Sequence, residues 1–151
     1  MLKQLRKNHI SILTEAKDWR SAIESSGQLL VKSGAVTEQY VESMVASVEE
    51  NGPYIVIAPG IAIAHARPNK SVKENALALA ILKEPVTFHS KENDPVDLVF
   101  SFSAIGDESH LKMIEQLSIF LMKEEQVNEL RNASTIEDAY QIILKGSEGN
   151  E

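Results

Sequence analysis

The chain has 151 residues, 22 of them acidic and 15 basic, and its formal net charge is −7. This length fits one domain with one core, and the acidic balance argues against a nucleic-acid partner, which needs clustered lysine and arginine. With no cysteine, the chain forms no disulfide, offers no thiolate nucleophile and binds no metal through sulfur.

Neither a disordered nor a membrane-spanning segment is visible in the composition. The basic start of the chain runs into His9 without an apolar signal core, and no stretch approaches the roughly 18 apolar residues of a membrane span. We therefore expect one folded domain over residues 1–146 and a frayed tail over 147–151. We also expect a cytoplasmic location without direct membrane insertion.

The first third of the chain predicts a strand followed by two helices. A short strand is expected at 10–13. The first helix starts after Asp18, a plausible cap, and stops at Gly34, while the second starts after Thr37 and stops at Gly52. Apolar residues recur at helical spacing in both segments, so each helix has one face for the core.

The next stretch predicts two brief strands, 54–57 and 61–64, joined at Pro59-Gly60. In the second strand, small and large apolar side chains alternate, which is typical of a strand covered on both faces. His65 follows at the point where this strand would emerge from the sheet. Residues at such a point reach a crevice while the sheet holds them rigidly.

The remainder of the chain alternates strands with helices. The expected strands are 76–82, 86–88 and 96–104, and the expected helices are 108–122 with Asp107 as cap, 124–131, and a last helix opened by a capping box at 134–137. This order, without a sequence repeat, predicts an α/β fold: a central mixed sheet of about five strands covered by helices.

The chain has four histidines. His9 and His89 lie among polar neighbours, and we expect both on the surface. His65 is either a core histidine with backbone partners or a site residue; Arg67, two residues on, supports the second interpretation. Alanines at 62, 64 and 66 either leave room for another molecule or let a helix pack closely.

His110 lies in the first turn of the predicted helix 108–122. If the strand before it runs parallel to the strand that ends at His65, both imidazoles reach the same sheet edge. Otherwise His110 is only a surface residue at the start of a helix. A shared crevice with two neutral imidazoles, a helix N-terminus and Arg67 would suit phosphoryl transfer to a histidine. A metal site ranks well below this, because no histidine pair has close ligand spacing.

The run Gly60-Ile61-Ala62-Ile63-Ala64-His65-Ala66-Arg67-Pro68 resembles the active-site signature of the type 2 enzyme IIA proteins of the bacterial phosphoenolpyruvate-dependent sugar phosphotransferase system, the mannitol and fructose class. Two further segments, 94–100 and 107–111, match the second block of this family. Within the class, residues 49–60 and 65–68 are similar to the ascorbate-specific branch.

The resemblance implies a mannitol-like enzyme IIA fold and a phosphotransferase activity. By it, His65 accepts a phosphoryl group from phospho-HPr and passes it to a cysteine of a cognate enzyme IIB, which acts with the membrane enzyme IIC. His110 matches a second histidine that stabilises the phosphorylated site. The step needs no cofactor and no metal.

The chain departs from the mannitol-type pattern in its charges. Many mannitol-type members have an Arg-Glu pair where counting back from His65 gives Glu49-Glu50, and Ala64 replaces the usual proline. Arg67 is expected to replace part of the lost positive charge, and Arg67 and Glu50 are the candidates for contacting phosphate or partner. Two other hypotheses are a nitrogen-type regulatory IIA module that controls partner proteins and a non-catalytic domain with structural histidines.

Overall fold

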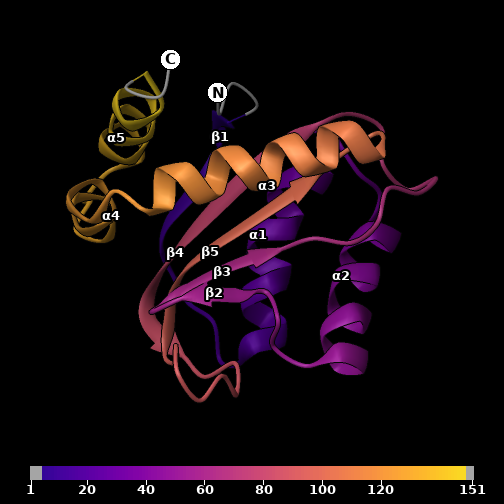
Figure 1. The fold of residues 1–151 in the computed structure, drawn as a ribbon, viewed down its shortest axis with the longest axis horizontal. Helices are drawn as coiled ribbons and strands as arrows, with labels where there is room; N and C mark the ends of the chain where they lie inside the picture. The colour runs from indigo at the N-terminus through magenta and orange to yellow at the C-terminus, as the bar shows by residue number, and fades with distance from the viewer. Residues whose placement is uncertain (1–4, 149–151) are drawn as a thin grey trace.

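A mixed sheet of five strands in the order β1-β4-β5-β3-β2 crosses the computed structural model, which describes residues 5–148 (Figure 1). β1 pairs in parallel with β4 and β3 with β5, whereas β4–β5 and β2–β3 are antiparallel. The strands are β1 Leu5–Thr14, β2 Val56–Ala58, β3 Ile61–Ala64, β4 Ala76–Val86 and β5 Val96–Ser103. The predicted α/β fold with a central mixed sheet is confirmed.

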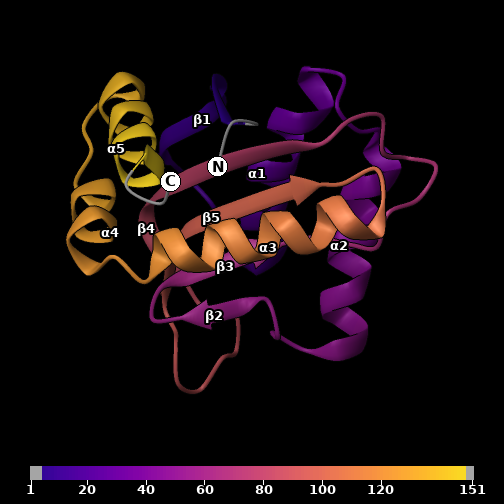
Figure 2. The same cartoon turned by 45° about the horizontal axis from the view of Figure 1, so that its top comes forward.

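Helices cover the two faces of this sheet in two groups. Helices α1 (Trp19–Lys32) and α2 (Glu38–Asn51) pack on one face, and α3 (Asp107–Leu121), α4 (Glu124–Arg131) and α5 (Ile136–Glu148) pack on the other. Figures 1 and 2 show α1 and α2 behind the sheet and α3 crossing in front of it. The core is therefore divided by the sheet into two apolar layers.

The alternation of side-chain size in β3 matches these two layers. Ala62 and Ala64 are buried against the α1–α2 layer, whereas Ile61 and Ile63 are buried against the α3–α5 layer. β4 repeats the arrangement, with its alanines toward α1 and α2 and larger aliphatic side chains toward the other layer. The first two of the three alanines near His65 therefore allow close helix packing and do not line an open space.

Three strand predictions were wrong in their bounds. β2 is Val56–Ala58 and not 54–57. β1 starts at Leu5 and not at residue 10, because Leu5 already pairs with Leu77 of β4; the register is irregular across the polar residues 6–8 that follow. β4 continues to Val86, which pairs with Val96, so the separate strand predicted at 86–88 does not form. The pairing is irregular between Ile81 and Val86, where exposed polar residues had suggested an end.

The predicted surface position of His9 was also wrong. Its side chain is only 1% exposed, and its Nδ1 lies 3.1 Å from the Leu77 carbonyl oxygen while Nε2 lies 2.8 Å from the Ser33 hydroxyl. Both ring nitrogens thus have partners in neighbouring elements, as a buried imidazole requires. His9 is the core histidine, whereas the polar residues 6–8 before it are exposed. His89 lies exposed in the turn after β4, as predicted.

The helix starts follow the capping predictions in part. Asp18 caps α1, since its side chain accepts a hydrogen bond from the Ser21 backbone N–H (2.8 Å). Thr37 occupies the N-cap of α2 but makes no capping hydrogen bond through its side chain. At α3 the prediction was wrong: Gly106, with an extended backbone, is the N-cap and Asp107 is the first helical residue.

The last helix begins after Thr135, whose hydroxyl accepts a hydrogen bond from the backbone N–H of Asp138 (3.0 Å). The capping contact is therefore made by the second residue of the predicted box. α5 extends through Glu148, and residues 149–151 of the predicted tail lie outside the described residues.

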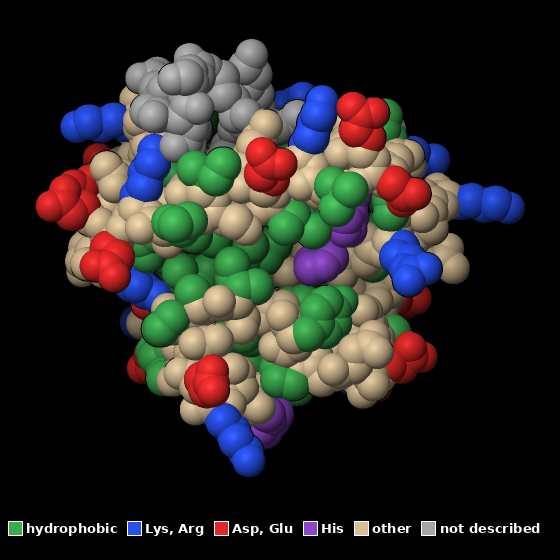
Figure 3. All heavy atoms as spheres, viewed as in Figure 1, with side chains coloured by type: hydrophobic (Ala, Val, Ile, Leu, Met, Phe, Trp, Pro, Cys, Tyr) green, Lys and Arg blue, Asp and Glu red, His purple; other side chains and the backbone are tan. Residues whose placement is uncertain are grey.

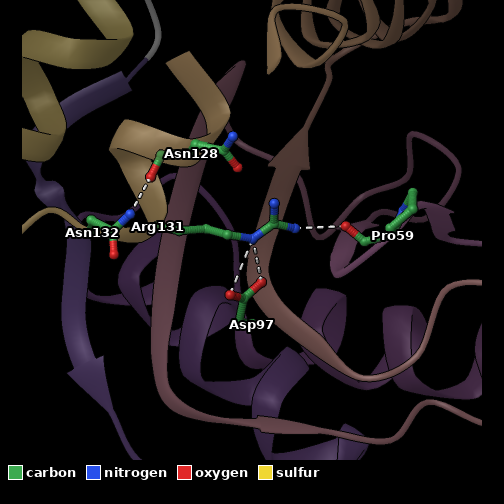
Figure 4. A network of polar contacts seen from close by, with 5 residues as sticks. All are labelled: Pro59, Asp97, Asn128, Arg131 and Asn132. Atoms are coloured by element: carbon green, nitrogen blue, oxygen red, sulfur yellow. Dashed lines mark hydrogen bonds and ion pairs between the residues drawn. The ribbon is translucent and has the colours of Figure 1, made fainter. Parts of the chain in front are cut away.

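An arginine from α4 holds the turn that opens β3 (Figure 4). Arg131 donates from Nε to both Asp97 carboxylate oxygens (3.0 and 3.1 Å) and from Nη2 to the Pro59 carbonyl oxygen (2.6 Å). Gly60 has φ +78°, and a Cβ there would lie 2.5 Å from Arg131 Nη2. Only glycine fits this place without strain. The start of β3 is thus tied to both β5 and α4.

We predict that Arg131→Ala lowers the free energy of unfolding by about 2 kcal/mol, because it removes hydrogen bonds to a partly buried carboxylate and leaves that carboxylate without its cation. Urea denaturation followed by circular dichroism measures the loss. The matched control is Arg20→Ala, which breaks the exposed ion pair with Glu49 and should cost less than about 1 kcal/mol. Equal losses in the two variants would contradict a special role for the Arg131 contacts.

Candidate functional site

His65 is the first residue beyond β3, at the sheet edge where β5 also ends. β3 and β5 run parallel, and their last registered pair is Ala64 with Ser101. The chain then leaves β5 and enters α3, whose first turn carries His110. The structure therefore brings the two predicted histidines together, with ring centroids 5.3 Å apart.

The His65 ring is held by contacts on several sides. Its Nδ1 lies 2.8 Å from the Ile63 carbonyl oxygen, and because a carbonyl only accepts, Nδ1 carries the hydrogen. The ring stacks on Phe102 with centroids 5.1 Å apart and planes 4° apart, and Tyr54 and His110 approach it edge-on. This tautomer leaves the lone pair on Nε2.

Both imidazoles are neutral at pH 7. Burial lowers the pKa of His65 from its ordinary value of 6.5; the hydrogen bond to the Ile63 carbonyl opposes this change, and the neighbouring His110 adds to it. Burial also lowers the pKa of His110, against the opposing effect of the Asp107 carboxylate. A neutral imidazole with a free nitrogen lone pair is a nucleophile at this pH.

His110 differs from His65 in having an unsatisfied nitrogen. Its Nδ1 is buried and has no hydrogen-bond partner among the described residues. The ring packs edge-on against Phe102, with centroids 5.1 Å apart. A buried polar atom without a partner is uncommon in a folded protein and calls for a reason, such as a ligand that binds there.

A cleft of about 720 Å³ opens beside the two histidines, between α2, the segment after β3 and the start of α3. Both other predicted site residues, Arg67 and Glu50, line it. The remaining lining residues are Ser43, Ala46, Ser47, Asn51, Tyr54, Ala66 and Asn69. All four predicted site residues thus share one cleft, and of the three alanines near His65 only Ala66 borders it.

Three site features were not predicted. The Tyr54 hydroxyl lies 2.7 Å from the Ser47 hydroxyl across the cleft wall, Phe102 supports the His65 ring, and Tyr40 bonds the backbone near it. One sequence signal could have indicated the wall: Ser43, Ser47 and Glu50 recur at helical spacing beside the apolar face of α2. No local signal marks Phe102 or Tyr40, which look like ordinary core residues.

The acidic pair that replaces the mannitol-type Arg-Glu pair is divided between two surfaces. Glu50 lines the cleft, whereas Glu49 forms an ion pair with Arg20 of α1. An arginine therefore does lie near this end of α2, but it is contributed by α1 and paired with Glu49. Arg67 is the cation among the described residues that line the cleft.

Nothing in the described part of the chain resembles a metal centre. Among residues 5–148, no group of three or more histidine, aspartate or glutamate side chains could hold a metal ion. Within the same residues, none of the helices has the length and apolar character needed to cross a membrane.

Residues 3–146 match the family described as "Phosphoenolpyruvate-dependent sugar phosphotransferase system, EIIA 2". The chain belongs to this family. It is 34% identical over 135 residues to the ascorbate-specific PTS system EIIA component of Shigella boydii, covering 89% of this chain and 88% of that protein. The corresponding Salmonella typhimurium component is 34% identical over 137 residues, covering 90% and 89%.

A solved structure supports the same assignment. The mannitol-specific cryptic phosphotransferase enzyme IIA CmtB from Escherichia coli is similar to this chain with a TM-score of 0.84 and 33% identity, covering 93% of this chain and 95% of the other. This EIIA chain is therefore a phosphotransferase component of a sugar transport system with the mannitol-type IIA fold.

We predict that His65 titrates with a midpoint below 6.5 and keeps its hydrogen on Nδ1 when neutral. Because the pKa is lowered, the ring stays neutral as the pH falls from 8 through 7 and is protonated only below its ordinary range. Nitrogen-15 chemical shifts of the imidazole, recorded against pH, report both properties. A midpoint above 6.5, or a hydrogen on Nε2, would contradict the geometry of the site.

Proposed function

We propose that His65 is the phosphoryl acceptor of this EIIA chain. It takes the phosphoryl group from the phosphohistidine of HPr and passes it to a cysteine of a cognate enzyme IIB, and the transporter is completed by a membrane enzyme IIC. The observation that carries the proposal is the hydrogen bond from His65 Nδ1 to the Ile63 carbonyl (2.8 Å), which leaves Nε2 as the free nucleophile.

Two displacements at phosphorus make up the transfer. In the first, the phosphorus–nitrogen bond of the donor breaks while a bond from His65 Nε2 to phosphorus forms, and the donor imidazole recovers its lone pair. In the second, the Nε2–phosphorus bond breaks and a thiolate of enzyme IIB takes the group. While phosphorylated, the ring keeps the hydrogen on Nδ1 and gains positive charge, which the Ile63 carbonyl stabilises. The protein supplies position and electrostatics.

The transferred phosphoryl group carries a charge of about −2 at pH 7, and this charge would enter the cleft. His110, whose Nδ1 lacks a partner among the described residues, is the proposed hydrogen-bond donor to a phosphoryl oxygen. Arg67 borders the same cleft and supplies a permanent positive charge. Together they would compensate for the arginine that this chain lacks at Glu49.

Glu50 has a different proposed role, because a carboxylate repels a phosphoryl group. It borders the cleft and is exposed, so it is placed to meet a basic side chain of the donor protein. Apolar surface continues from the histidines across the face formed by α3 and β2 (Figure 3). Exposed Leu111 lies in α3, Ile57 lies in β2, and Met122 directly follows α3. Such a surface fits a protein partner.

The proposed transported substrate is ascorbate. Relatives at 34% identity that match nearly the whole chain are named as ascorbate-specific EIIA components, and this favours the transporter over a nitrogen-type regulatory module. Donor, acceptor and this chain would meet in the cytoplasm, where HPr is phosphorylated. The presence of neighbouring genes for a IIB and a IIC protein would test the transport role.

The acceptor is tested by incubating the chain with phosphoenolpyruvate, enzyme I and HPr. The wild type should gain an acid-labile, base-stable phosphoryl group, and His65→Ala should gain none because the nucleophile is removed. His89→Ala is the matched control, since His89 lies exposed in a turn outside the cleft, and it should be labelled fully. Full labelling of His65→Ala would refute the assignment.

His110→Ala should fold normally and transfer the phosphoryl group about a hundredfold more slowly, the usual effect of removing one donor that stabilises transferred charge. Arg67→Ala should slow transfer less, because its charge is exposed to solvent and screened. Rapid-quench measurement of His65 phosphorylation gives both rates. His110→Gln, which retains a donor, should recover part of the lost rate. An unchanged rate in His110→Ala would make that residue a surface feature only.

A further inference from the structure

The Tyr40 hydroxyl forms an unusual bridge next to His65. Tyr40 lies in the first turn of α2 and its side chain is only 1% exposed. Its hydroxyl oxygen lies 2.7 Å from the Phe102 carbonyl oxygen and accepts a hydrogen bond from the Ala66 N–H at 3.1 Å. The Ala66 carbonyl oxygen, 3.2 Å from the Tyr40 hydroxyl oxygen, is a second and more distant acceptor. A side chain from the helix layer therefore joins the backbone segments on both sides of the imidazole.

The register of the sheet shows what this bridge replaces. β3 and β5 pair in parallel up to Ala64 with Ser101. If the pairing continued, Ala66 would lie opposite Ser103, and a parallel ladder would direct the Ala66 N–H to the Phe102 carbonyl. These are the two groups that the Tyr40 hydroxyl joins. The hydroxyl oxygen thus takes the place of the next hydrogen bond between β3 and β5 and separates the two strands at His65.

We propose that Tyr40 is a positioning residue for phosphoryl transfer, whose hydroxyl holds the ends of β3 and β5 apart and in fixed register so that His65 faces the cleft. Tyr40 acts through Ala66, the residue after His65, and through Phe102, on which the His65 ring stacks. This inference rests on the proposed function of His65 and adds the group that orients it.

The hydroxyl is suited to this task across the working pH range. Burial raises the pKa of Tyr40 to about 12, so the group keeps its hydrogen and can donate to Phe102 while accepting from Ala66. A phenylalanine would fill nearly the same space but would leave the partly buried Ala66 N–H and the buried Phe102 carbonyl without this partner. The ends of β3 and β5 would then either approach and form a direct hydrogen bond from the Ala66 N–H to the Phe102 carbonyl, or separate further. Both changes move His65.

The test compares Tyr40→Phe with the wild type in the HPr-dependent labelling assay. We expect the rate constant at saturating HPr to fall about ten- to a hundredfold, the scale of a small misplacement of reacting atoms, while the KM for HPr changes less than about twofold. Nitrogen-15 shifts of His65 should show loss of the single Nδ1–H tautomer. Unchanged kinetics and an unchanged tautomer would overturn the inference.

Two controls separate positioning from stability. Tyr140→Phe removes a hydroxyl on α5, outside the cleft, and should transfer at the wild-type rate. Ser26→Ala removes a buried hydroxyl that bonds the Ile23 carbonyl within α1; it should lower stability without slowing transfer. If Ser26→Ala slowed transfer as much as Tyr40→Phe at equal stability, Tyr40 would have only a structural role.

Amide hydrogen exchange in the wild type gives a test that does not depend on the variant folding. The Ala66 N–H should be protected like an amide of the sheet, although Ala66 lies beyond β3. Exchange at the rate of an open loop would overturn the bridge. A wild type that gains no phosphoryl group on His65 would instead refute the proposed function, so the two failures are distinguishable.

Discussion

The parallel pairing of β3 with β5 is the constraint on which the site depends. Parallel strands end at the same edge of a sheet, so the residue after β3 and the first turn of α3, which follows β5, meet there. Burial on both faces fixes the register, because a shift by one residue would exchange the alanines and isoleucines of β3 between the two apolar layers. The contacts of Arg131 with Pro59 and Asp97 hold the opposite end of the same pair.

The site contains little charge, although the chemistry proposed for it concerns a doubly charged group. Both imidazoles are neutral because burial lowers their pKa values, and Arg67 and Glu50 lie in the cleft wall that borders solvent. A neutral ring is the nucleophilic form, and His110 Nδ1, which is buried and has no partner among the described residues, belongs to the proposed donor. Burial thus keeps His65, the proposed acceptor, in its neutral form.

Much of this could be predicted from local pattern. The alternation of side-chain size predicts a doubly covered β3, and the position of His65 after it predicts a sheet-edge imidazole. The apparent loss of arginine at Glu49 was only partly informative, because Arg20 of α1 reaches the same helix end. The surface assignment of His9 failed because its polar neighbours point to solvent while its own ring points to Leu77 and Ser33.

The sequence by itself determined the α/β class through periodicity, and its motifs, through their resemblance to a known family, indicated the family and the candidate residues His65, His110, Arg67 and Glu50. Only the tertiary structure decided which nitrogen of His65 is free and which histidine is in the core. It also decided that the Tyr40 hydroxyl replaces a hydrogen bond between β3 and β5. Those features depend on contacts between segments far apart in the chain: Tyr40 meets Phe102 across 62 positions. Periodicity describes the face that a residue presents but does not identify the partner on the other side.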